Sequence, residues 1–314
     1  MAAPEAPAVP AAPGVTGEAG ETAVAVIGAG TIGLSWARLL ATHGHPVRIF
    51  DPRPDLSEVV GSFTAEHPDL APRISRAESA AEAVRGAAHV QESTPERIEV
   101  KRALLAELAE AVPDEALILS SSSTLPATRM AEGLPDSVAA RLLIGHPFNP
   151  PHLMPLVEVV PGEWTAPASV EGAVEFYRSL GRAPVVLHRE ATGFVGNRLQ
   201  NAVLREALHL VQTGVVSPED LDTLVTNSLG LRWAAVGPFE GMHLGGGPEG
   251  FRGFMAHIGA SFAAIDLHEP DLTAEGLEPV FRQVEEAYGP HWSTESAQRR
   301  DHIQADILTR RPAG

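Results

Sequence analysis

The chain of 314 residues contains no cysteine. This absence excludes a disulfide framework, a thiol nucleophile and a thiolate metal site. Lysine is almost absent as well, since Lys101 is the only one, so a catalytic lysine would have to be that residue. His243 and His257 stand at no convincing metal-ligand spacing with an acid, and we therefore expect no bound metal.

Positive charge is scarce compared with negative charge. The 23 Lys and Arg residues face 40 Asp and Glu residues, which gives a formal net charge of −17. Nucleic acids and anionic membranes bind clustered Lys and Arg, so neither is an expected partner. No apolar run reaches the length of a membrane span. Residues 1–22 are rich in Ala, Pro and Gly and lack signal-peptide regions, which predicts a disordered tail on a cytoplasmic protein.

What the chain does contain is a glycine-rich turn between a short apolar strand and a helix. The strand is expected at residues 23–27 and the helix at 34–42, with the pattern G-x-G-x-x-G between them. Gly28 permits the tight turn, Gly30 lets the backbone approach a pyrophosphate, and Gly33 lets helix and strand pack closely. The N–H groups that open the helix would bind the pyrophosphate. The predicted pyrophosphate-binding residues are Gly28, Gly30, Thr31, Ile32 and Gly33.

The residue after the next strand indicates which dinucleotide binds. Asp51 follows the strand predicted at residues 47–50, where an acid accepts a hydrogen bond from a ribose 2′-hydroxyl. This position favours NAD as the cofactor. Arg53 lies two residues later and could contact a 2′-phosphate, which leaves NADP as the disfavoured alternative.

Strands and helices alternate along the first part of the chain, and helices alone follow. This order predicts an α/β fold in which an N-terminal Rossmann-type doubly wound parallel sheet precedes an all-α C-terminal domain. We place the NAD-binding domain at residues 23–190 and a helical substrate and dimerisation domain at residues 191–314. Further strands are expected near residues 89–91, 116–119, 142–144, 156–160 and 185–187.

Two stretches carry weak patterns. Residues 52–88 are polar and interrupted by proline, and the one helix expected there covers residues 77–85. Residues 241–253 are rich in glycine and are expected to form a loop or short turn. Between these stretches, Ser217 and Pro218 mark the start of a helix, as cap and first helical residue.

A histidine and a glutamate lie on neighbouring predicted strands. His146 follows one strand, and Glu158 lies within the next. Oxidation of a secondary alcohol needs a base for the hydroxyl proton while a hydride leaves for a nicotinamide, and imidazole titrates near neutral pH. Glu158 would fix the ring tautomer and stabilise the imidazolium. In the alternative interpretation His146 only caps a strand end and Glu158 pairs with an arginine.

Three sequence blocks extend this pattern. They are I-G-H-P-F-N-P-P at residues 144–151, M-P-L-V-E-V-V at 154–160 and G-F-V-G-N-R-L at 193–199. Together with the glycine-rich turn, Glu96 and Lys101, they resemble the 3-hydroxyacyl-CoA dehydrogenase superfamily. The resemblance covers most of the chain between the predicted tail and the last helices.

The resemblance implies roles for further residues. It places Asn197 and one of four consecutive serines near the substrate oxygen. Anchoring the family pattern on Leu125 selects Ser123, a slip of one residue selects Ser122, and Thr124 stays a further candidate. The implied catalytic residues are His146, Glu158, Asn197 and Ser123, and the implied cofactor contacts are Glu96, Lys101 and Asn149.

The run G-L-R-W-A-A-V-G-P at residues 230–238 resembles the branch that contains λ-crystallin, L-gulonate 3-dehydrogenase and L-carnitine dehydrogenase. Members that act on CoA thioesters carry a long helical hairpin where residues 52–88 are short here, which disfavours CoA. We therefore predict an NAD-dependent dehydrogenase of a small 3-hydroxy acid, L-gulonate-like or carnitine-like. Ser122 would contact the substrate, Arg232 would pair with its carboxylate, and Trp233 would help to enclose a trimethylammonium group.

Two other functions stay open. One is a dehydrogenase of 3-hydroxyacyl thioesters that uses CoA or a carrier protein. The other is a non-catalytic NAD(H)-binding protein, against which the complete set of His146, Glu158 and Asn197 argues. The resemblance also implies a homodimer joined through the helical domains.

Overall fold

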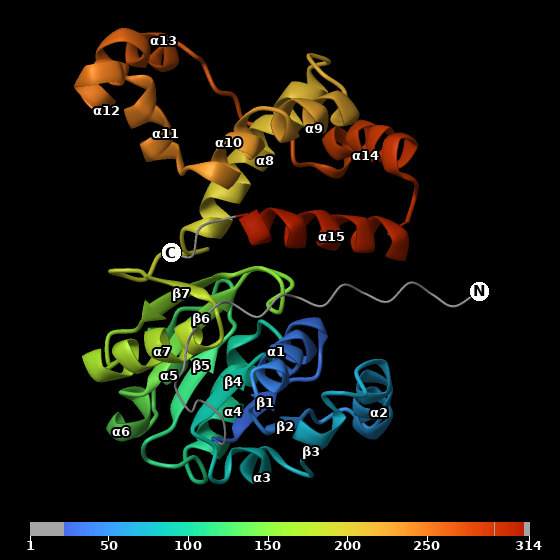
Figure 1. Cartoon of the computed structure of the whole chain (residues 1–314), viewed down its shortest axis with the longest axis vertical. Coiled ribbons are helices and arrows are strands. Elements are labelled where there is room, and N and C mark those ends of the chain that lie inside the picture. The colour runs from blue at the N-terminus through green and yellow to red at the C-terminus, as the bar shows by residue number, and fades with distance from the viewer. Residues whose placement is uncertain (1–21, 292, 311–314) are drawn as a thin grey trace. The chain divides into compact units, whose positions relative to one another are not determined.

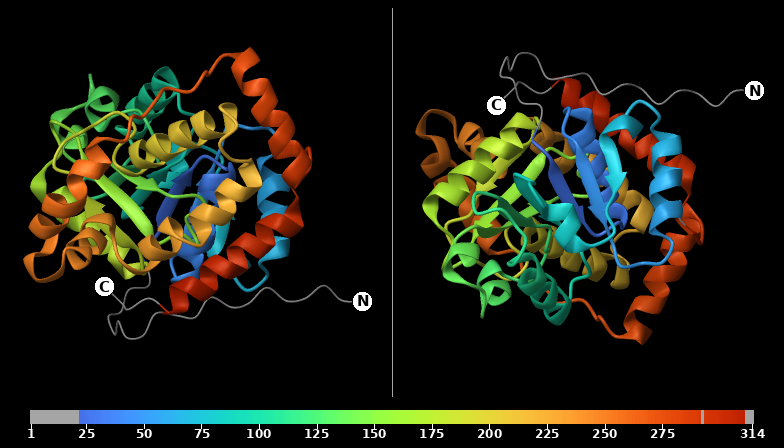
Figure 2. Two further views of the ribbon diagram at one scale, coloured as in Figure 1. Left: turned by 90° about the horizontal axis from the view of Figure 1, so that it is seen from above. Right: turned by 90° about the horizontal axis from the view of Figure 1, so that it is seen from below.

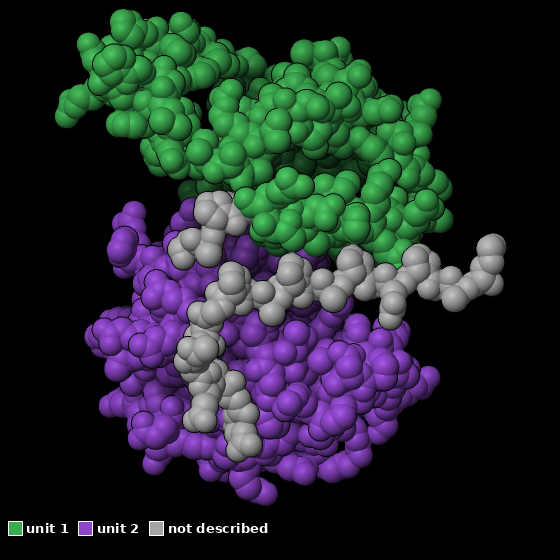
Figure 3. Space-filling model, in the orientation of Figure 1, with its two compact units in different colours: residues 1–10, 198–313 green, residues 11–197, 314 purple. Residues whose placement is uncertain are grey.

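The computed structural model describes residues 22–291 and 293–310. The chain forms two compact units, which Figure 3 draws in different colours. Among the described residues, unit 2 runs up to Asn197, and unit 1 begins at Arg198. The tail predicted at residues 1–22 lies outside the described residues except for its last residue.

Unit 2 is built on one sheet of eight strands (Figure 1). The strands are β1 (Val24–Ile27), β2 (Val47–Phe50), β3 (Ile74–Arg76), β4 (His89–Glu92), β5 (Leu117–Ser120), β6 (Leu142–Pro147), β7 (Leu156–Pro161) and β8 (Ala183–Val186). Their order in space is β3-β2-β1-β4-β5-β6-β7-β8, and all neighbours pair in parallel except β6 and β7. The predicted doubly wound sheet is thereby confirmed, except that β7 and β8 run opposite to the other six strands.

Helices cover both faces of this sheet (Figure 2). The helices of unit 2 are α1 (Thr31–Thr42), α2 (Leu56–Glu66), α3 (Ala80–Val84), α4 (Ile98–Leu108), α5 (Ala127–Ala131), α6 (Asp136–Ala139) and α7 (Pro167–Ser179). One core packs α1, α2 and α7 on the sheet, with Trp36 and Tyr177 as its largest side chains. The second core packs α3 to α6 on the other face, around Leu105 and Met130. Because strands with helices on both sides bury both faces, every residue of β1, β5 and β6 is buried, and all are apolar except Ser120 and His146.

Residues 52–88 differ from the expectation of a single helix at 77–85. The structure has the eleven-residue helix α2 and the edge strand β3 in this interval, and α3 is shorter than expected. Helix α2 buries only Leu56 and Val60, and β3 buries only Ile74. Elements with so few buried residues leave little periodicity in the sequence, and pairing with β2 rather than local propensity forms β3. The interval, which is described throughout, contains no helical hairpin.

Unit 1 is helical, as predicted. Its helices are α8 (Gly196–Gln212, which begins at the end of unit 2), α9 (Pro218–Thr226), α10 (Leu229–Ala235), α11 (Pro238–Gly245), α12 (Gly250–Phe254), α13 (Ala260–Ala263), α14 (Ala274–Tyr288) and α15 (Thr294–Arg310), with a π-helical turn at Met255–Gly259. The Ser217 hydroxyl caps α9 by accepting a hydrogen bond from the Asp220 N–H, which confirms the predicted helix start. None of the helices in the described part of the chain combines the length and hydropathy that a membrane span requires.

The prediction of a loop or short turn at residues 241–253 is wrong for most of this stretch. Helix α11 continues to Gly245, and α12 begins at Gly250. The glycines serve close packing instead, because a Cβ at Gly246 would overlap the Gly250 carbonyl oxygen and a Cβ at Gly253 would lie 2.6 Å from that of Gly246. A glycine-rich stretch therefore brings two short helices together here rather than forming a loop.

A buried polar network joins α7 to β4, to the residue that follows β5 and to α1. The Tyr177 hydroxyl donates to Gln91 Oε1 at 3.0 Å, and Gln91 Nε2 donates to the Ser121 hydroxyl at 2.9 Å. Trp36 Nε1 donates to the same hydroxyl at 3.1 Å. The Tyr177 hydroxyl also fills the space that a Cβ at Gly145 would need. Only glycine fits there, so Tyr177 fixes how closely α7 approaches β6.

We predict that His89 makes the fold sensitive to acid. Its ring stacks on Phe176 with centroids 3.9 Å apart, and no described group hydrogen-bonds to its buried Nδ1. Burial, helped by the nearby His45, lowers the pKa of His89 from 6.5 to about 4. The neutral form is therefore favoured in the folded state, and this contribution to stability is present above pH 6.5 and lost as the pH falls toward 4. We expect this residue to remove about 3 kcal/mol from the free energy of unfolding over that interval.

Urea unfolding of the wild type and of His89→Leu at neutral pH and at about pH 4 measures this effect. The variant should lose less stability on acidification than the wild type does. His188→Leu, which removes an exposed histidine of the same unit, serves as the control and should keep the full acid sensitivity. Equal losses in the wild type and His89→Leu would contradict the assignment.

Candidate active site

The glycine-rich turn leaves the N-terminus of α1 open. Gly28 has a positive φ of 107°, and a Cβ there would lie 2.5 Å from the Ser93 carbonyl oxygen. A Cβ at Gly33 would overlap the Gly28 carbonyl oxygen, whereas one at Gly30 would meet nothing within 4 Å. No side chain caps α1, and its first turn contains no acid. Its first N–H groups are thus available to an anion, as a pyrophosphate requires.

Asp51 is held over this turn by backbone hydrogen bonds. Its Oδ2 accepts from the Ala29 N–H at 2.8 Å, and its Oδ1 accepts from the Arg53 N–H at 3.0 Å. Each carboxylate oxygen has a second lone pair that can accept from a ribose hydroxyl. The open helix N-terminus and the fixed carboxylate beside it fit a dinucleotide with a free 2′-hydroxyl.

His146 and Glu158 form a buried pair across β6 and β7. The two residues lie opposite each other in the antiparallel register, and His146 Nδ1 is 2.8 Å from Glu158 Oε2. His146 is 4% exposed and Glu158 2%. The register of β6 and β7 therefore places a carboxylate directly against the imidazole.

The other oxygen of Glu158 is also satisfied. Glu158 Oε1 accepts from the N–H groups of Val195 at 2.9 Å and Gly196 at 3.0 Å. Burial raises the pKa of Glu158, but the hydrogen bonds from His146 and from these two N–H groups outweigh it, so the pKa lies below its usual range. An ionised carboxylate only accepts hydrogen bonds. His146 Nδ1 therefore carries a proton and donates it to this carboxylate.

The segment that follows β8 is shaped around this pair. Phe194 is buried, has a positive φ of 50°, and its ring centroid lies 5.4 Å from that of His146. A left-handed backbone is unfavourable for a bulky residue, and here it precedes the two N–H groups that bind Glu158. The predicted residue Asn197 comes next, half-buried in the first turn of α8.

The serine-rich segment after β5 is anchored by Glu96. Glu96 Oε1 accepts from the backbone N–H groups of Ser123, Thr124 and Leu125, at 2.7 to 3.1 Å. It also accepts from the hydroxyls of Ser122 and Thr124, both at 2.8 Å. Burial raises the pKa of Glu96, but these hydrogen bonds and the charge of Lys101 outweigh that effect. The pKa therefore lies below its usual range, and the carboxylate is ionised.

Four of the five hydroxyls in this segment already have partners within the protein. Ser120 donates to Glu92, Ser121 belongs to the network with Gln91, and Ser122 and Thr124 donate to Glu96. Among the described residues, none forms a hydrogen bond with the Ser123 hydroxyl, and this side chain is half-buried. Ser123 is therefore the hydroxyl of this run that remains for a ligand.

Lys101 lies in a buried ion pair that the sequence does not reveal. Its Nζ donates to both oxygens of Glu92, at 2.9 and 2.8 Å, and lies 3.8 Å from Glu96 Oε2. Lys101 and Glu92 are each 1% exposed. The signal that could have found Glu92 is an acid at the end of a predicted strand, nine residues before the only lysine in the sequence.

The other predicted residues lie in loops or in unit 1. Asn149 is exposed in the loop after β6. Arg232 and Trp233 belong to α10 of unit 1, where Trp233 is 41% exposed. Among the described residues no group of three or more His, Asp or Glu side chains is arranged to hold a metal ion.

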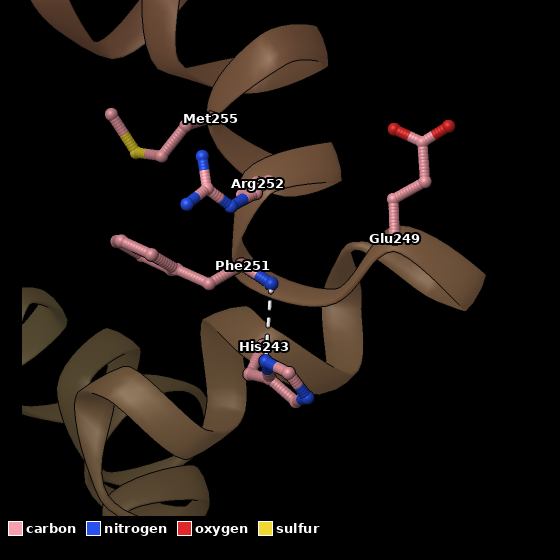
Figure 4. A pocket seen from close by; sticks show the side chains of 5 residues that line it. All are labelled: His243, Glu249, Phe251, Arg252 and Met255. Carbon is pink, nitrogen blue, oxygen red and sulfur yellow. Dashed lines mark hydrogen bonds between the residues drawn. The ribbon is translucent and has the colours of Figure 1, made fainter.

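Unit 1 also contains an open cavity of about 680 Å³. Figure 4 shows its lining, in which Phe251, Arg252 and Met255 lie on one side while Glu249 points away. The Phe251 N–H donates to His243 Nδ1 at 3.1 Å. The Phe251 ring belongs to an aromatic cluster in which, among the described contacts, Trp233 takes no part.

Comparisons with known proteins cover nearly the whole chain. Residues 23–191 match the domain family described as 3-hydroxyacyl-CoA dehydrogenase, NAD binding domain, and residues 193–276 match the C-terminal domain of the same family. An L-carnitine dehydrogenase of Streptomyces griseus is 38% identical over 298 residues, with 91% of this chain and 88% of the relative covered. A λ-crystallin homologue of Bos taurus is 43% identical over 237 residues, with 70% and 73% covered.

A solved structure supports the same assignment. It is an FHMPC 5-dehydrogenase, described as an NAD⁺-dependent dismutase, with a TM-score of 0.73 and 27% identity over 92% of this chain and 99% of the other. The resemblance noted from the sequence blocks is thereby confirmed. The chain belongs to the 3-hydroxyacyl-CoA dehydrogenase family and is an NAD-dependent dehydrogenase.

Proposed function

We propose that the protein oxidises the 3-hydroxyl group of a small hydroxy acid, L-gulonate-like or carnitine-like, with His146 as the general base. The observation that carries this proposal is the buried pair of His146 and the ionised Glu158, which leaves one ring nitrogen free to take a proton. The preference for a free acid is supported by relatives named L-carnitine dehydrogenase. The absence of a helical hairpin in the fully described residues 52–88 supports it as well.

The two residues act on the hydroxyl proton. His146 Nε2 accepts the proton of the substrate alcohol, and Glu158 stabilises the imidazolium that results. The Val195 and Gly196 N–H groups keep the carboxylate in place during this change of charge. The nicotinamide of bound NAD⁺ supplies the hydride acceptor that the polypeptide lacks.

The cofactor would be held at the carboxyl edge of the sheet. Gly28, Gly30, Thr31, Ile32 and Gly33 would bind its pyrophosphate, and Asp51 its adenosine ribose. Glu96 Oε2 and the Asn149 amide would contact the part of the cofactor that lies beyond its adenosine ribose and pyrophosphate. Lys101 is 1% exposed, so in this proposal it acts through its ion pairs with Glu92 and Glu96.

The substrate would be oriented by hydrogen bonds to its reacting oxygen and by contacts to its two ends. Ser123 and Asn197 would donate hydrogen bonds to the oxygen that becomes a carbonyl. Ser122 would hold the serine segment in place through its hydrogen bonds to Glu96 and Leu125. Arg232 would pair with the carboxylate of the substrate, and Trp233 would contact its other end. These assignments follow the sequence blocks, and the unused hydroxyl of Ser123 supports its choice over Ser122.

A substrate panel tests the proposed function. Purified protein with NAD⁺ receives L-gulonate, L-carnitine, 3-hydroxybutyrate or 3-hydroxybutyryl-CoA, and the absorbance of reduced cofactor is followed. We expect turnover of a free hydroxy acid, and His146→Ala should lower kcat by about 10²- to 10⁴-fold while NADH binding persists. His188→Ala, which changes an exposed histidine, should keep the wild-type rate.

Two outcomes would contradict the proposal in different ways. Turnover of the thioester alone would make the protein a 3-hydroxyacyl thioester dehydrogenase. Tight NADH binding without turnover of any substrate in the panel would favour a non-catalytic NAD(H)-binding role.

Alanine variants of two neighbouring serines separate the candidate hydroxyls. Ser123→Ala should lower kcat by about 10²-fold and leave the midpoint of thermal unfolding unchanged, since its hydroxyl has no hydrogen-bond partner among the described residues. Ser122→Ala should destabilise the fold by about 1–2 kcal/mol, because it removes a buried hydroxyl bonded to Glu96 and Leu125. Steady-state kinetics and thermal melts measure both. A larger loss of kcat in a folded Ser122→Ala would assign the role to Ser122 instead.

We further propose a homodimer joined through unit 1. Among its described residues, the large apolar side chains that are buried are Val211, Phe254 and Val280. Many others are exposed, including Leu231 at 66% and Phe281 at 51%. Exposed apolar surface on this scale marks an interaction face, and a second copy of the chain would cover it on both partners equally.

Light scattering tests the dimer. The wild type should show twice the 33.1 kDa of one chain. Phe281→Glu should shift the mass toward the monomer, since it places a charge on the apolar face of α14, and the neighbouring Arg282→Glu should not. A wild-type mass equal to one chain would contradict the proposal.

A further inference from the structure

Two arginines lie where the ends of β2 and β3 meet. The strands pair in parallel, with Arg76 beside Ile49, and the Ala77 N–H donates to the Ile49 carbonyl oxygen at 2.9 Å. Asp51 and Arg53 follow β2 directly. Arg53 therefore comes two residues after the proposed ribose-binding acid, and Arg76 ends the neighbouring strand. A phosphate on the ribose 2′-oxygen would lie near this corner of the sheet.

Each of these arginines is paired with an acid two residues later in the chain. Arg53 Nε and Nη2 donate to the two oxygens of Asp55, at 2.6 and 2.8 Å. Arg76 likewise donates through both Nη atoms to the two oxygens of Glu78. Both pairs use the two-pronged geometry with which a guanidinium would otherwise bind a phosphate.

The two acids have little other work in the fold. The Asp55 side chain does not cap α2, although Asp55 occupies the N-cap position. The Glu78 side chain is 69% exposed and that of Asp55 46%, and exposed ion pairs stabilise a protein by less than about 1 kcal/mol. Their effect on a bound ligand is larger, because they occupy both guanidinium groups. Arg53, Arg76 and Asp51 together carry a charge of +1, and the two acids change the sum to −1.

We propose that Asp55 and Glu78 are specificity residues that keep the two arginines from a ribose 2′-phosphate. Discrimination against NADP then depends on these ion pairs as well as on Asp51. The inference rests on the proposed role of Asp51 at the adenosine ribose, and it concerns which dinucleotide binds rather than which alcohol reacts.

Fluorescence titration with NADPH and NADH tests the proposal without any turnover. Asp55→Asn combined with Glu78→Gln keeps the shape of both side chains and removes their charge. We expect this double variant to bind NADPH about tenfold more tightly than the wild type, while the Kd for NADH changes less than about twofold. Adding Arg53→Ala and Arg76→Ala should abolish the gain.

A matched control accounts for the loss of two negative charges. Glu110→Gln combined with Glu132→Gln removes two exposed carboxylates of the same unit, one of them the partner of Arg102. This control should leave the Kd for NADPH as in the wild type. The proposal is overturned if the Asp55 and Glu78 variant gains no affinity for NADPH, if the gain survives removal of the arginines, or if the control gains as much. Failure of the wild type to bind NADH would instead contradict the cofactor site itself.

Discussion

The buried carboxylate of Glu158 is the constraint on which the site depends. A buried anion is costly unless hydrogen-bond donors surround it, and three do so here, from His146, Val195 and Gly196. They come from β6 and from the segment that opens α8. This one charge therefore ties β6 and β7 to the segment that opens α8, where Phe194 with its left-handed backbone directly precedes two of the donors.

A second set of buried charges organises the neighbouring strands. Glu92 and Lys101 pair at the end of β4, and Glu96 gathers the backbone after β5. Replacing buried ion pairs by apolar groups is often neutral for stability, so such pairs are better understood as fixing position. Here they orient the serine segment, and the Tyr177–Gln91 network fixes the strand that carries His146. The carboxyl edge of the sheet is thus held by directed polar contacts, whereas its two faces are held by apolar packing.

Much of the fold could be predicted from the sequence, because it follows from strong local sequence patterns. The glycine spacing at residues 28–33 and the apolar strands are local signals, and the doubly wound sheet followed from them. Helix α2 and strand β3 were missed because each buries few side chains. The reversal of β7 was not predicted either, since alternation of strands says nothing about direction when the connection is a loop. Among the serines the sequence left the choice open, because hydroxyls of identical residues differ only in the partners that folding gives them.

The residues of the proposed function differ in how firmly the fold holds them. The base, its carboxylate and the dinucleotide turn all belong to unit 2, where strand ends and buried charges fix them. Arg232 and the aromatic cluster of unit 1 lie on short helices with few buried side chains. Proton transfer tolerates little displacement of the reacting groups, whereas selection among hydroxy acids depends on the shape and charge of the rest of the site. In the proposed function the groups that move the proton are therefore fixed by buried charges, whereas Arg232, the proposed partner of the substrate carboxylate, lies on a helix with no buried residue.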